Sequence, residues 1–112
     1  MSSSSEVRDR ISALVESSPV MLFMKGTRDM PQCGFSAQVI GILNRVAPEY
    51  STYDVLSDPD VREGIKEFSN WPTIPQLYVR GEFLGGCDIV TEMYESGELS
   101  KAMSVPGPEA SS

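Results

Sequence analysis

The sequence contains no histidine and only two cysteines, Cys33 and Cys87, among its 112 residues. The missing histidine excludes a Ser-His-Asp or Cys-His nucleophile pair, and it excludes zinc or haem held by histidine. Two cysteines are too few for a disulfide scaffold, and they cannot form a four-cysteine zinc site within one chain. The sequence therefore leaves thiol chemistry, or metal binding that recruits ligands from outside the chain.

Long apolar runs and basic residues are also scarce. No segment approaches the roughly 20 apolar residues of a membrane-spanning helix, and Met1 is followed by four serines rather than by the apolar core of a secretion signal. Lys and Arg number 9 against 16 Asp and Glu, which gives a net charge of −7. This balance argues against nucleic acid or a membrane as the main partner, although a local basic patch can still bind a small anion.

The two thiols favour a reducing compartment. We expect the protein in the cytoplasm, or in an organellar matrix or stroma if the chain is a processed eukaryotic form. The apolar pattern predicts one domain over residues 6–103, with a flexible N-terminal tail at 1–5 and a disordered C-terminal tail at 104–112.

The periodicity of the apolar residues predicts an α/β fold. The predicted elements, in chain order, are a helix capped by Ser3 with Glu6 and ending before Ser17, a strand over 20–24, a helix over 34–46, a strand over 50–56, a helix over 59–69, strands over 76–79 and 83–86, and a helix over 89–96 with a further turn or two over 98–103. A β-α-β half joined to a β-β-α half makes a four-stranded mixed sheet with helices on both faces, which is the thioredoxin-like arrangement.

Two helix starts are marked by aspartates. Asp58 is predicted as an N-cap, with Pro59 at the first helical position. Asp88 is predicted to cap the last long helix, and Gly97 to end it.

Cys33 lies where a turn-forming loop over 26–32 meets the second helix. The partial positive charge of a helix N-terminus stabilises an anion by about 0.3–1 kcal/mol. Such a site, with nearby cations, can lower the pKa of a cysteine from about 8.5 to roughly 3.5–7.5. Lys25 and Arg28 are the cations nearest in sequence. The alternative is a cysteine that is simply buried, but its neighbour Gly34 and the polar loop favour an exposed, ionisable thiol.

Four separated motifs agree with one known family: Met24-Lys25-Gly26-Thr27, Cys33-Gly34-Phe35-Ser36, Trp71-Pro72-Thr73-Ile74-Pro75-Gln76 and Gly85-Gly86-Cys87-Asp88. Together they resemble the monothiol glutaredoxins that carry a Cys-Gly-Phe-Ser active site. The resemblance covers residues 6–103, and it implies a single glutaredoxin domain.

The resemblance implies a site for glutathione. It places Lys25 and Arg62 at the glycine carboxylate of glutathione, where cations pair with an anion. It places the backbone of Ile74 beside the cysteinyl unit and the Asp88 region at the γ-glutamyl end. The residues assigned to glutathione are Lys25, Arg62, Thr73, Ile74, Pro75, Gly86, Cys87 and Asp88, and Cys33 is assigned as the catalytic thiol and the metal ligand.

Several of these residues have a second interpretation. Arg62 is equally readable as a solvated charge at a helix edge, and Asp88 as a plain N-cap. Trp71 either packs or contacts the ligand, and Thr73 is expected to support the loop. Cys87 is either a small buried thiol or, as the family suggests, a partner for Cys33 in a disulfide.

Ser36 stands where a dithiol glutaredoxin has its second cysteine, so the motif cannot form an internal disulfide. A [2Fe–2S] cluster needs four ligands, usually cysteine thiolates. The resemblance implies that two copies of Cys33 and two glutathione thiolates supply them, in a homodimer that reverts to a monomer without the cluster. The implied function is a glutathione-dependent carrier that passes the cluster to iron–sulfur acceptor proteins.

Two other functions stay open. The first is a monothiol oxidoreductase that removes glutathione from protein thiols, and for this chain we expect weak or no such activity beside the carrier function. The second is a binding module that forms a heterodimer with a BolA-like protein, as the family suggests.

Overall fold

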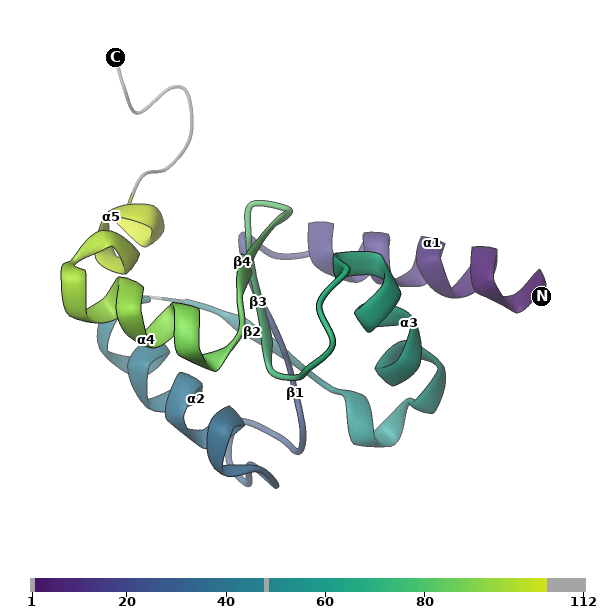
Figure 1. The fold of residues 1–112 in the computed structure, drawn as a ribbon, viewed down its shortest axis with the longest axis horizontal. Coiled ribbons are helices and arrows are strands. Elements are labelled where there is room, and N and C mark those ends of the chain that lie inside the picture. The colour runs from purple at the N-terminus through teal and green to yellow at the C-terminus, as the bar shows by residue number, and fades with distance from the viewer. Residues whose placement is uncertain (1, 48, 105–112) are drawn as a thin grey trace, which may run out of the picture.

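The computed structural model describes residues 2–47 and 49–104. Its centre is a four-stranded sheet in the order β2-β1-β3-β4 (Figure 1). The strands are β1 (Val20–Met24), β2 (Ser51–Asp54), β3 (Gln76–Val79) and β4 (Glu82–Gly85). β1 is parallel to β2 and antiparallel to β3, and β3 is antiparallel to β4. The predicted four-stranded mixed sheet and its thioredoxin-like arrangement are confirmed.

Helices cover both faces of this sheet (Figure 1). α1 and α3 pack on one face, and α2, α4 and α5 pack on the other. The bounds are α1 (Ser2–Glu16), α2 (Gly34–Val46), the 3-10 turn η1 (Val55–Ser57), α3 (Pro59–Ser69), α4 (Cys87–Ser96) and α5 (Glu98–Ser104). Across residues 2–47 and 49–104, no helix combines the length and the apolar character that crossing a membrane requires.

β1 is buried along its whole length because it contributes to two cores. Val20, Leu22 and Met24 pack on the side of α2, α4 and α5, whereas Met21 and Phe23 pack on the side of α1 and α3. Successive side chains of a strand point to opposite faces, so a central strand covered on both faces is apolar without interruption. This packing fixes β1, and the carboxyl end of β1 leads directly into the site.

Several predicted element ends are confirmed. Asp58 is the N-cap of α3, where its carboxylate accepts a hydrogen bond from the N–H of Val61 at 3.3 Å, and Pro59 follows at the first position. Gly97 ends α4 with a left-handed backbone, φ 86°.

Three other ends differ from the prediction. α1 begins at Ser2, so Ser3 lies within the helix rather than at its N-cap; once a turn of helix exists, each further residue adds a hydrogen bond at low cost. β2 ends at Asp54, because the carboxylate of Asp54 accepts a hydrogen bond from the N–H of Leu56 and starts η1. Residues 105–112 of the predicted C-terminal tail lie outside the described residues, and Ser104 is the last residue of α5.

The prediction that Asp88 caps the last long helix is wrong. α4 begins at Cys87, and its N-cap is Gly86, which makes no side-chain capping bond. Asp88 is instead in the first turn of α4. A carboxylate there still interacts favourably with the positive end of the helix. Among the described residues, the Asp88 carboxylate makes no capping hydrogen bond.

Candidate functional site

One pocket of about 480 Å³ gathers every residue that the sequence assigned to a site. These residues are Lys25, Cys33, Arg62, Thr73, Ile74, Pro75, Gly86, Cys87 and Asp88. The pocket also includes Phe35, Lys66, Trp71 and Pro72. It lies where the carboxyl end of β1, the N-termini of α2 and α4, one side of α3 and the loop before β3 converge. Their contacts with a ligand stay a prediction.

Cys33 is the N-cap of α2 and is partly exposed. Burial works against its ionisation. The backbone N–H groups of Ser36 and Phe35, the charge of Lys25 and the hydroxyl of Ser36 outweigh that penalty and lower the pKa of Cys33 below its ordinary value. The sulfur makes no side-chain capping hydrogen bond. These groups therefore stabilise the thiolate electrostatically, as donors and a cation near the sulfur. The predicted low-pKa thiol is thus consistent with the geometry.

Ser36 is fully buried and contributes to the same thiol. Its hydroxyl oxygen accepts a hydrogen bond from the N–H of Lys25 at 3.1 Å. Because the oxygen is engaged as an acceptor, the hydroxyl proton is available to the sulfur of Cys33. Ser36 therefore joins the end of β1 to the thiol.

The loop before Cys33 is held at both ends. The N–H of Gly26 donates to the carboxylate of Asp54 at 2.9 Å, and the N–H of Gln32 donates to the carbonyl of Lys25 at 2.8 Å. Gly26 has φ 94°, and a Cβ there would lie 2.5 Å from the backbone nitrogen of Gln32. Only glycine fits this position, and Asp54, which holds it, was not predicted to belong to the site.

Arg28 does not act on Cys33 as its sequence position suggested. Its guanidinium stacks 4.1 Å from the centre of the Tyr50 ring and donates a hydrogen bond of 2.6 Å to the Tyr50 carbonyl. Arg28 is absent from the groups that shift the pKa of Cys33. The loop turns this side chain toward the start of β2, so Lys25 is the cation that acts on the thiol.

The opposite wall of the pocket is the loop between α3 and β3. Its Ile74–Pro75 peptide bond is cis. The Trp71 ring lies 5.8 Å from the Phe83 ring, centre to centre, and a Cβ on Gly86 would lie 2.9 Å from the indole nitrogen of Trp71. Trp71 thus packs and lines the pocket at once, and the close approach of α4 requires glycine at position 86.

Cys87 is the first residue of α4 and is partly exposed in the same pocket. Burial raises its pKa, the hydroxyl of Thr91 opposes this, and the charges of Asp88 and Cys33 raise it further, so that the net pKa lies above the ordinary value. Thr91 in turn accepts a hydrogen bond of 2.9 Å from Gln38 of α2. Both cysteines are free thiols in this structure.

Comparison with known proteins agrees with this geometry. A family model described as glutaredoxin matches residues 20–84, more than half of the chain. A monothiol glutaredoxin of Synechocystis is 56% identical over 100 residues, which cover 89% of this chain and 94% of that protein. This chain belongs to the monothiol glutaredoxins.

Another relative of this monothiol glutaredoxin is the mitochondrial monothiol glutaredoxin-5 of Saccharomyces cerevisiae, which is 58% identical over 100 residues, 87% of this chain and 67% of that protein. The solution structure of reduced apo GrxS14 from poplar has a TM-score of 0.75 and 48% identity, and the match covers 87% of this chain and 93% of that chain. The chain spans only 20% of the length of two longer monothiol glutaredoxins from plants.

The pocket of this monothiol glutaredoxin is cationic although the chain as a whole is acidic. Of the described residues that line it, Lys25, Arg62 and Lys66 are basic and Asp88 is acidic. Arg62 and Lys66 are four residues apart on α3, so they share one face of that helix. The pocket is therefore suited to an anion that also carries a positive group at the end near Asp88.

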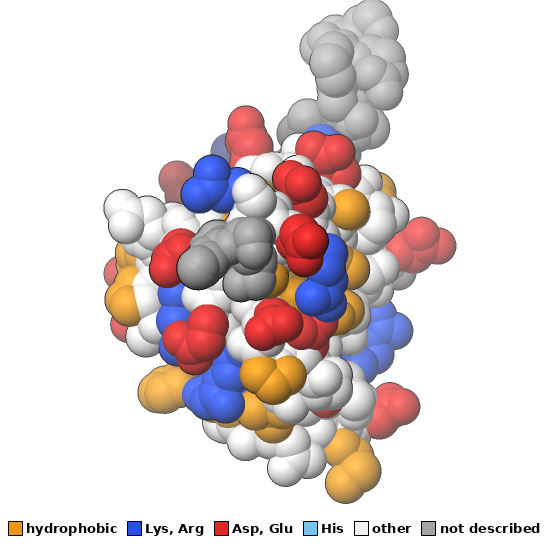
Figure 2. Space-filling model, turned by 90° about the vertical axis from the view of Figure 1, so that its right-hand side faces the viewer, with side chains coloured by type: hydrophobic (Ala, Val, Ile, Leu, Met, Phe, Trp, Pro, Cys, Tyr) orange, Lys and Arg blue, Asp and Glu red, His pale blue; other side chains and the backbone are white. Residues whose placement is uncertain are grey.

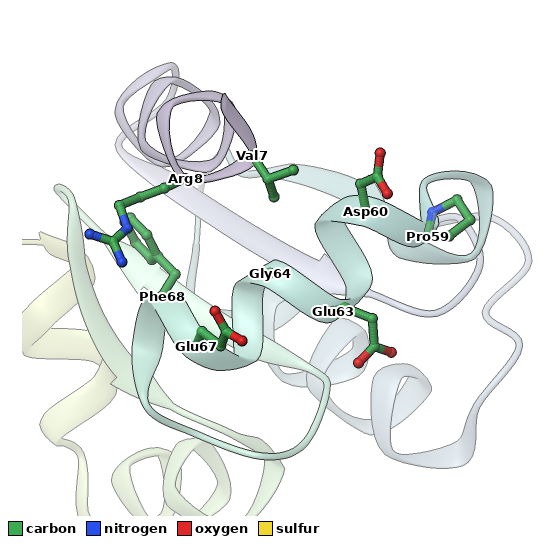
Figure 3. A pocket seen from close by; sticks show the side chains of 8 residues that line it. All are labelled: Val7, Arg8, Pro59, Asp60, Glu63, Gly64, Glu67 and Phe68. Carbon is green, nitrogen blue, oxygen red and sulfur yellow. The ribbon is translucent and has the colours of Figure 1, made fainter. Parts of the chain in front are cut away.

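A second hollow, of about 210 Å³, lies between α1 and α3 (Figure 3). Asp60, Glu63 and Glu67 border it, with Arg8 as a basic residue on its rim. Figure 2 shows this end of the molecule, where acidic side chains are prominent on the surface. A Cβ on Gly64 would lie 2.5 Å from a methyl group of Val7, which marks a close helix crossing. This hollow contains no thiol, and its form is explained by packing.

Three polar residues that support the pocket were not singled out in the sequence. They are Asp54, which holds Gly26; Thr91, which contacts Cys87; and Gln76, which is fully buried beneath the loop before β3. Gln76 does carry a signal, because a polar residue opening an otherwise apolar strand indicates a buried hydrogen-bonding role. Asp54 and Thr91 carry no comparable signal, since their partners lie far away in the sequence.

Proposed function

We propose that this monothiol glutaredoxin is a glutathione-dependent carrier of [2Fe–2S] clusters. The observation that carries the proposal is a single pocket in which a lone thiol of lowered pKa, Cys33, lies among basic side chains. Thiolate is the form of cysteine that binds iron. The buried Ser36 in place of a second cysteine leaves Cys33 without a partner inside its motif.

In this proposal, glutathione lies along the pocket. Lys25 and Arg62 bind its glycine carboxylate by charge-assisted hydrogen bonds, and Lys66 of α3 lines the same pocket. The backbone of Ile74, supported by Thr73 and Pro75, pairs with the cysteinyl unit. Its γ-glutamyl end meets Gly86, Cys87 and Asp88, where the carboxylate of Asp88 suits the ammonium group and the N-terminus of α4 suits the carboxylate.

The side chains that could ligate iron are too few for one chain to hold the cluster alone, which supports a cluster shared between molecules. No group of three or more potential ligand side chains occurs within residues 2–47 and 49–104. Cys33 is the thiol with the lowered pKa, whereas the pKa of Cys87 is raised. One chain therefore offers one good ligand, and we assign the other three to a second Cys33 and two glutathione thiolates. The cluster is cargo, held by a homodimer and absent from the monomer.

Exposed apolar side chains beside the thiol are suited to protein partners. Phe35, which lines the pocket, is 61% exposed, and Met30 in the neighbouring loop is 66% exposed. Large apolar side chains in such positions are typical of protein contact sites. We assign this rim to the second copy in the homodimer, to iron–sulfur acceptor proteins and to a BolA-like partner, in a thiol-reducing compartment such as the cytoplasm.

Anaerobic reconstitution with iron, sulfide and glutathione tests the carrier function. We expect a coloured dimer for the wild type, a colourless monomer for Cys33→Ser, and a coloured dimer for the matched control Cys87→Ser. Absorption spectra and size-exclusion chromatography provide the measurements. A colourless wild type, or an unchanged coloured dimer for Cys33→Ser, would rule out the proposal.

The lowered pKa of Cys33 also favours a second function, the removal of glutathione from protein thiols. The Cys33 thiolate attacks the glutathione sulfur of a mixed disulfide, and the released protein thiolate takes up a proton. A second glutathione thiolate then attacks the Cys33–glutathione disulfide, which yields glutathione disulfide and restores the Cys33 thiolate. Rapid turnover of a glutathionylated substrate by the apo protein would favour this function over the carrier.

A further inference from the structure

The loop that forms one wall of the pocket is anchored by a single buried side chain. Gln76, the first residue of β3, is fully buried. Its side-chain amide donates one hydrogen bond to the carbonyl of Trp71 and one to the carbonyl of Thr73, both at 3.1 Å. Its amide oxygen accepts a hydrogen bond from the hydroxyl of Tyr78, also at 3.1 Å.

The orientation of the Gln76 amide is fixed by these partners. Two carbonyl oxygens cannot donate, so the NH₂ group has to face them and the amide oxygen has to face Tyr78. Burial raises the pKa of Tyr78 to about 12, although Ser69 opposes this through a hydrogen bond. The hydroxyl of Tyr78 therefore keeps its proton under physiological conditions and remains a donor to Gln76.

The bond to Thr73 has a consequence for the next residue. The Thr73–Ile74 peptide is trans, since the cis bond of this loop is the following one. In a planar trans peptide the C=O and the N–H point in opposite directions. With the carbonyl of Thr73 turned inward to Gln76, the N–H of Ile74 is turned away from Gln76 toward the pocket.

The environment of Ile74 agrees with this direction. Its side chain packs in the core on the side of α1 and α3, and the residue also lines the pocket, which agrees with a backbone that faces the pocket. Within residues 2–47 and 49–104, its N–H makes no backbone hydrogen bond. The other carbonyl held by Gln76, that of Trp71, precedes Pro72, which has no N–H to expose. The hydrogen bonds of Gln76 thus leave the Ile74 N–H as an unpaired donor that faces the pocket.

We infer that Gln76 is the positioning residue of the glutathione site, because it turns the Ile74 N–H outward to bind the backbone of the cysteinyl unit. The inference rests on the proposed function for the identity of the ligand. The direction of the N–H is a property of the chain alone, so the two can fail separately.

The first test uses the wild type and no ligand. Amide hydrogen exchange, followed by NMR, is expected to be at least about tenfold faster for Ile74 than for the paired amides within β3, because its N–H is unpaired. An Ile74 amide as protected as those of β3 would overturn the inference, whatever the protein binds.

The second test compares two variants that break different bonds of Gln76. Gln76→Met removes both donors at similar volume, whereas Tyr78→Phe removes the hydroxyl and leaves both loop bonds in place. Trp71 is the single tryptophan of the chain and lies in this loop, so its fluorescence reports glutathione binding. We expect a loss of about five- to tenfold in glutathione affinity for Gln76→Met, the size of one hydrogen bond, and less than about twofold for Tyr78→Phe.

Thermal unfolding of both variants separates positioning from stability. If Gln76→Met does not fold, Gln76→Glu takes its place, because it keeps the shape and the acceptor for Tyr78. Equal losses of affinity in Tyr78→Phe and the Gln76 variant would contradict positioning by Gln76, as would a folded Gln76 variant with unchanged affinity. A wild type that shows no response to glutathione would overturn the proposed function, while the exchange of the Ile74 amide still decides the placement.

Discussion

The N-termini of α2 and α4 meet in one pocket, and each carries a cysteine. The pKa values of the two thiols are nevertheless shifted in opposite directions from the ordinary value. The pKa of Cys33 is lowered and that of Cys87 is raised. Burial is the strongest influence at both sulfurs and raises both pKa values, so the sign of each net shift depends on whether neighbouring groups outweigh it. Cys33 is faced by backbone N–H groups, a hydroxyl and the charge of Lys25, whereas Cys87 has the carboxylate of Asp88 beside it. A helix N-terminus alone therefore does not lower the pKa of a thiol; at Cys33 the backbone N–H groups, Lys25 and the Ser36 hydroxyl outweigh burial, whereas at Cys87 the Thr91 hydroxyl does not.

The difference between the two thiols is tested most directly in variants that each retain a single cysteine. We expect Cys33→Ser to slow alkylation by iodoacetamide at pH 7 by about tenfold or more, since thiolate is the reacting form and Cys87 holds its proton more tightly. Cys87→Ser is expected to react nearly as fast as the wild type. Mass spectrometry of the modified sites provides the measurement, and equal rates for the two variants would contradict the assignment.

The pH dependence of the same reaction sharpens the comparison. A lowered pKa means that the thiolate persists to lower pH, so the midpoint of the alkylation profile of Cys33 in Cys87→Ser should lie below the ordinary pKa of a cysteine. The midpoint for Cys87 in Cys33→Ser should lie above that value, because burial continues to raise its pKa after the charge of Cys33 is gone. Stopped-flow rates between pH 5 and pH 10 test the sign of each shift. Coincident profiles would show that the two sites do not differ.

Ser36→Ala tests the contribution of the Ser36 hydroxyl to the lowered pKa of Cys33. It removes the acceptor of the Lys25 N–H and a group that stabilises the Cys33 thiolate. We expect the alkylation profile of Cys33 to move to higher pH and the free energy of unfolding to fall by about 1–3 kcal/mol, the cost of a buried unpaired donor. Urea denaturation gives the second quantity. Thr91→Ala is the matched control, since it removes a hydroxyl from Cys87 and should leave Cys33 unchanged.

Asp88→Asn is expected to give the smallest effect, on the second thiol. Removal of the carboxylate should move the profile of Cys87 to lower pH and speed its alkylation by about two- to fivefold, the size of one partly screened charge interaction. Cys33 should not respond, because Asp88 is not among the groups that shift its pKa. A shift of the profile of Cys33 instead of that of Cys87 would contradict the assignment of the Asp88 charge to Cys87.

The elements themselves were largely readable from the sequence. The uninterrupted apolar run Val20–Met24 indicated a central strand, and Asp58 with Pro59 marked the start of α3. The N-cap of α4 lies two residues before the predicted one, because Asp88 has the chemistry of an N-cap but Gly86 occupies that position. Local sequence gives several residues an equal claim to a helix end, and Gly86 is the one that lies against Trp71, where a Cβ would lie 2.9 Å from the indole nitrogen.

The sequence by itself determined the α/β elements, the lone cysteine of the Cys-Gly-Phe-Ser motif and the absence of any histidine chemistry, because these depend on residue type and local spacing. Only the tertiary structure decided that Lys25 rather than Arg28 acts on Cys33, that Asp88 acts on Cys87, and that Gln76 directs the backbone of Ile74. The physical reason is the same in each case. Electrostatic and hydrogen-bonding effects fall off over a few ångströms, and the chain brings these groups within that range only when the helices have packed on the sheet.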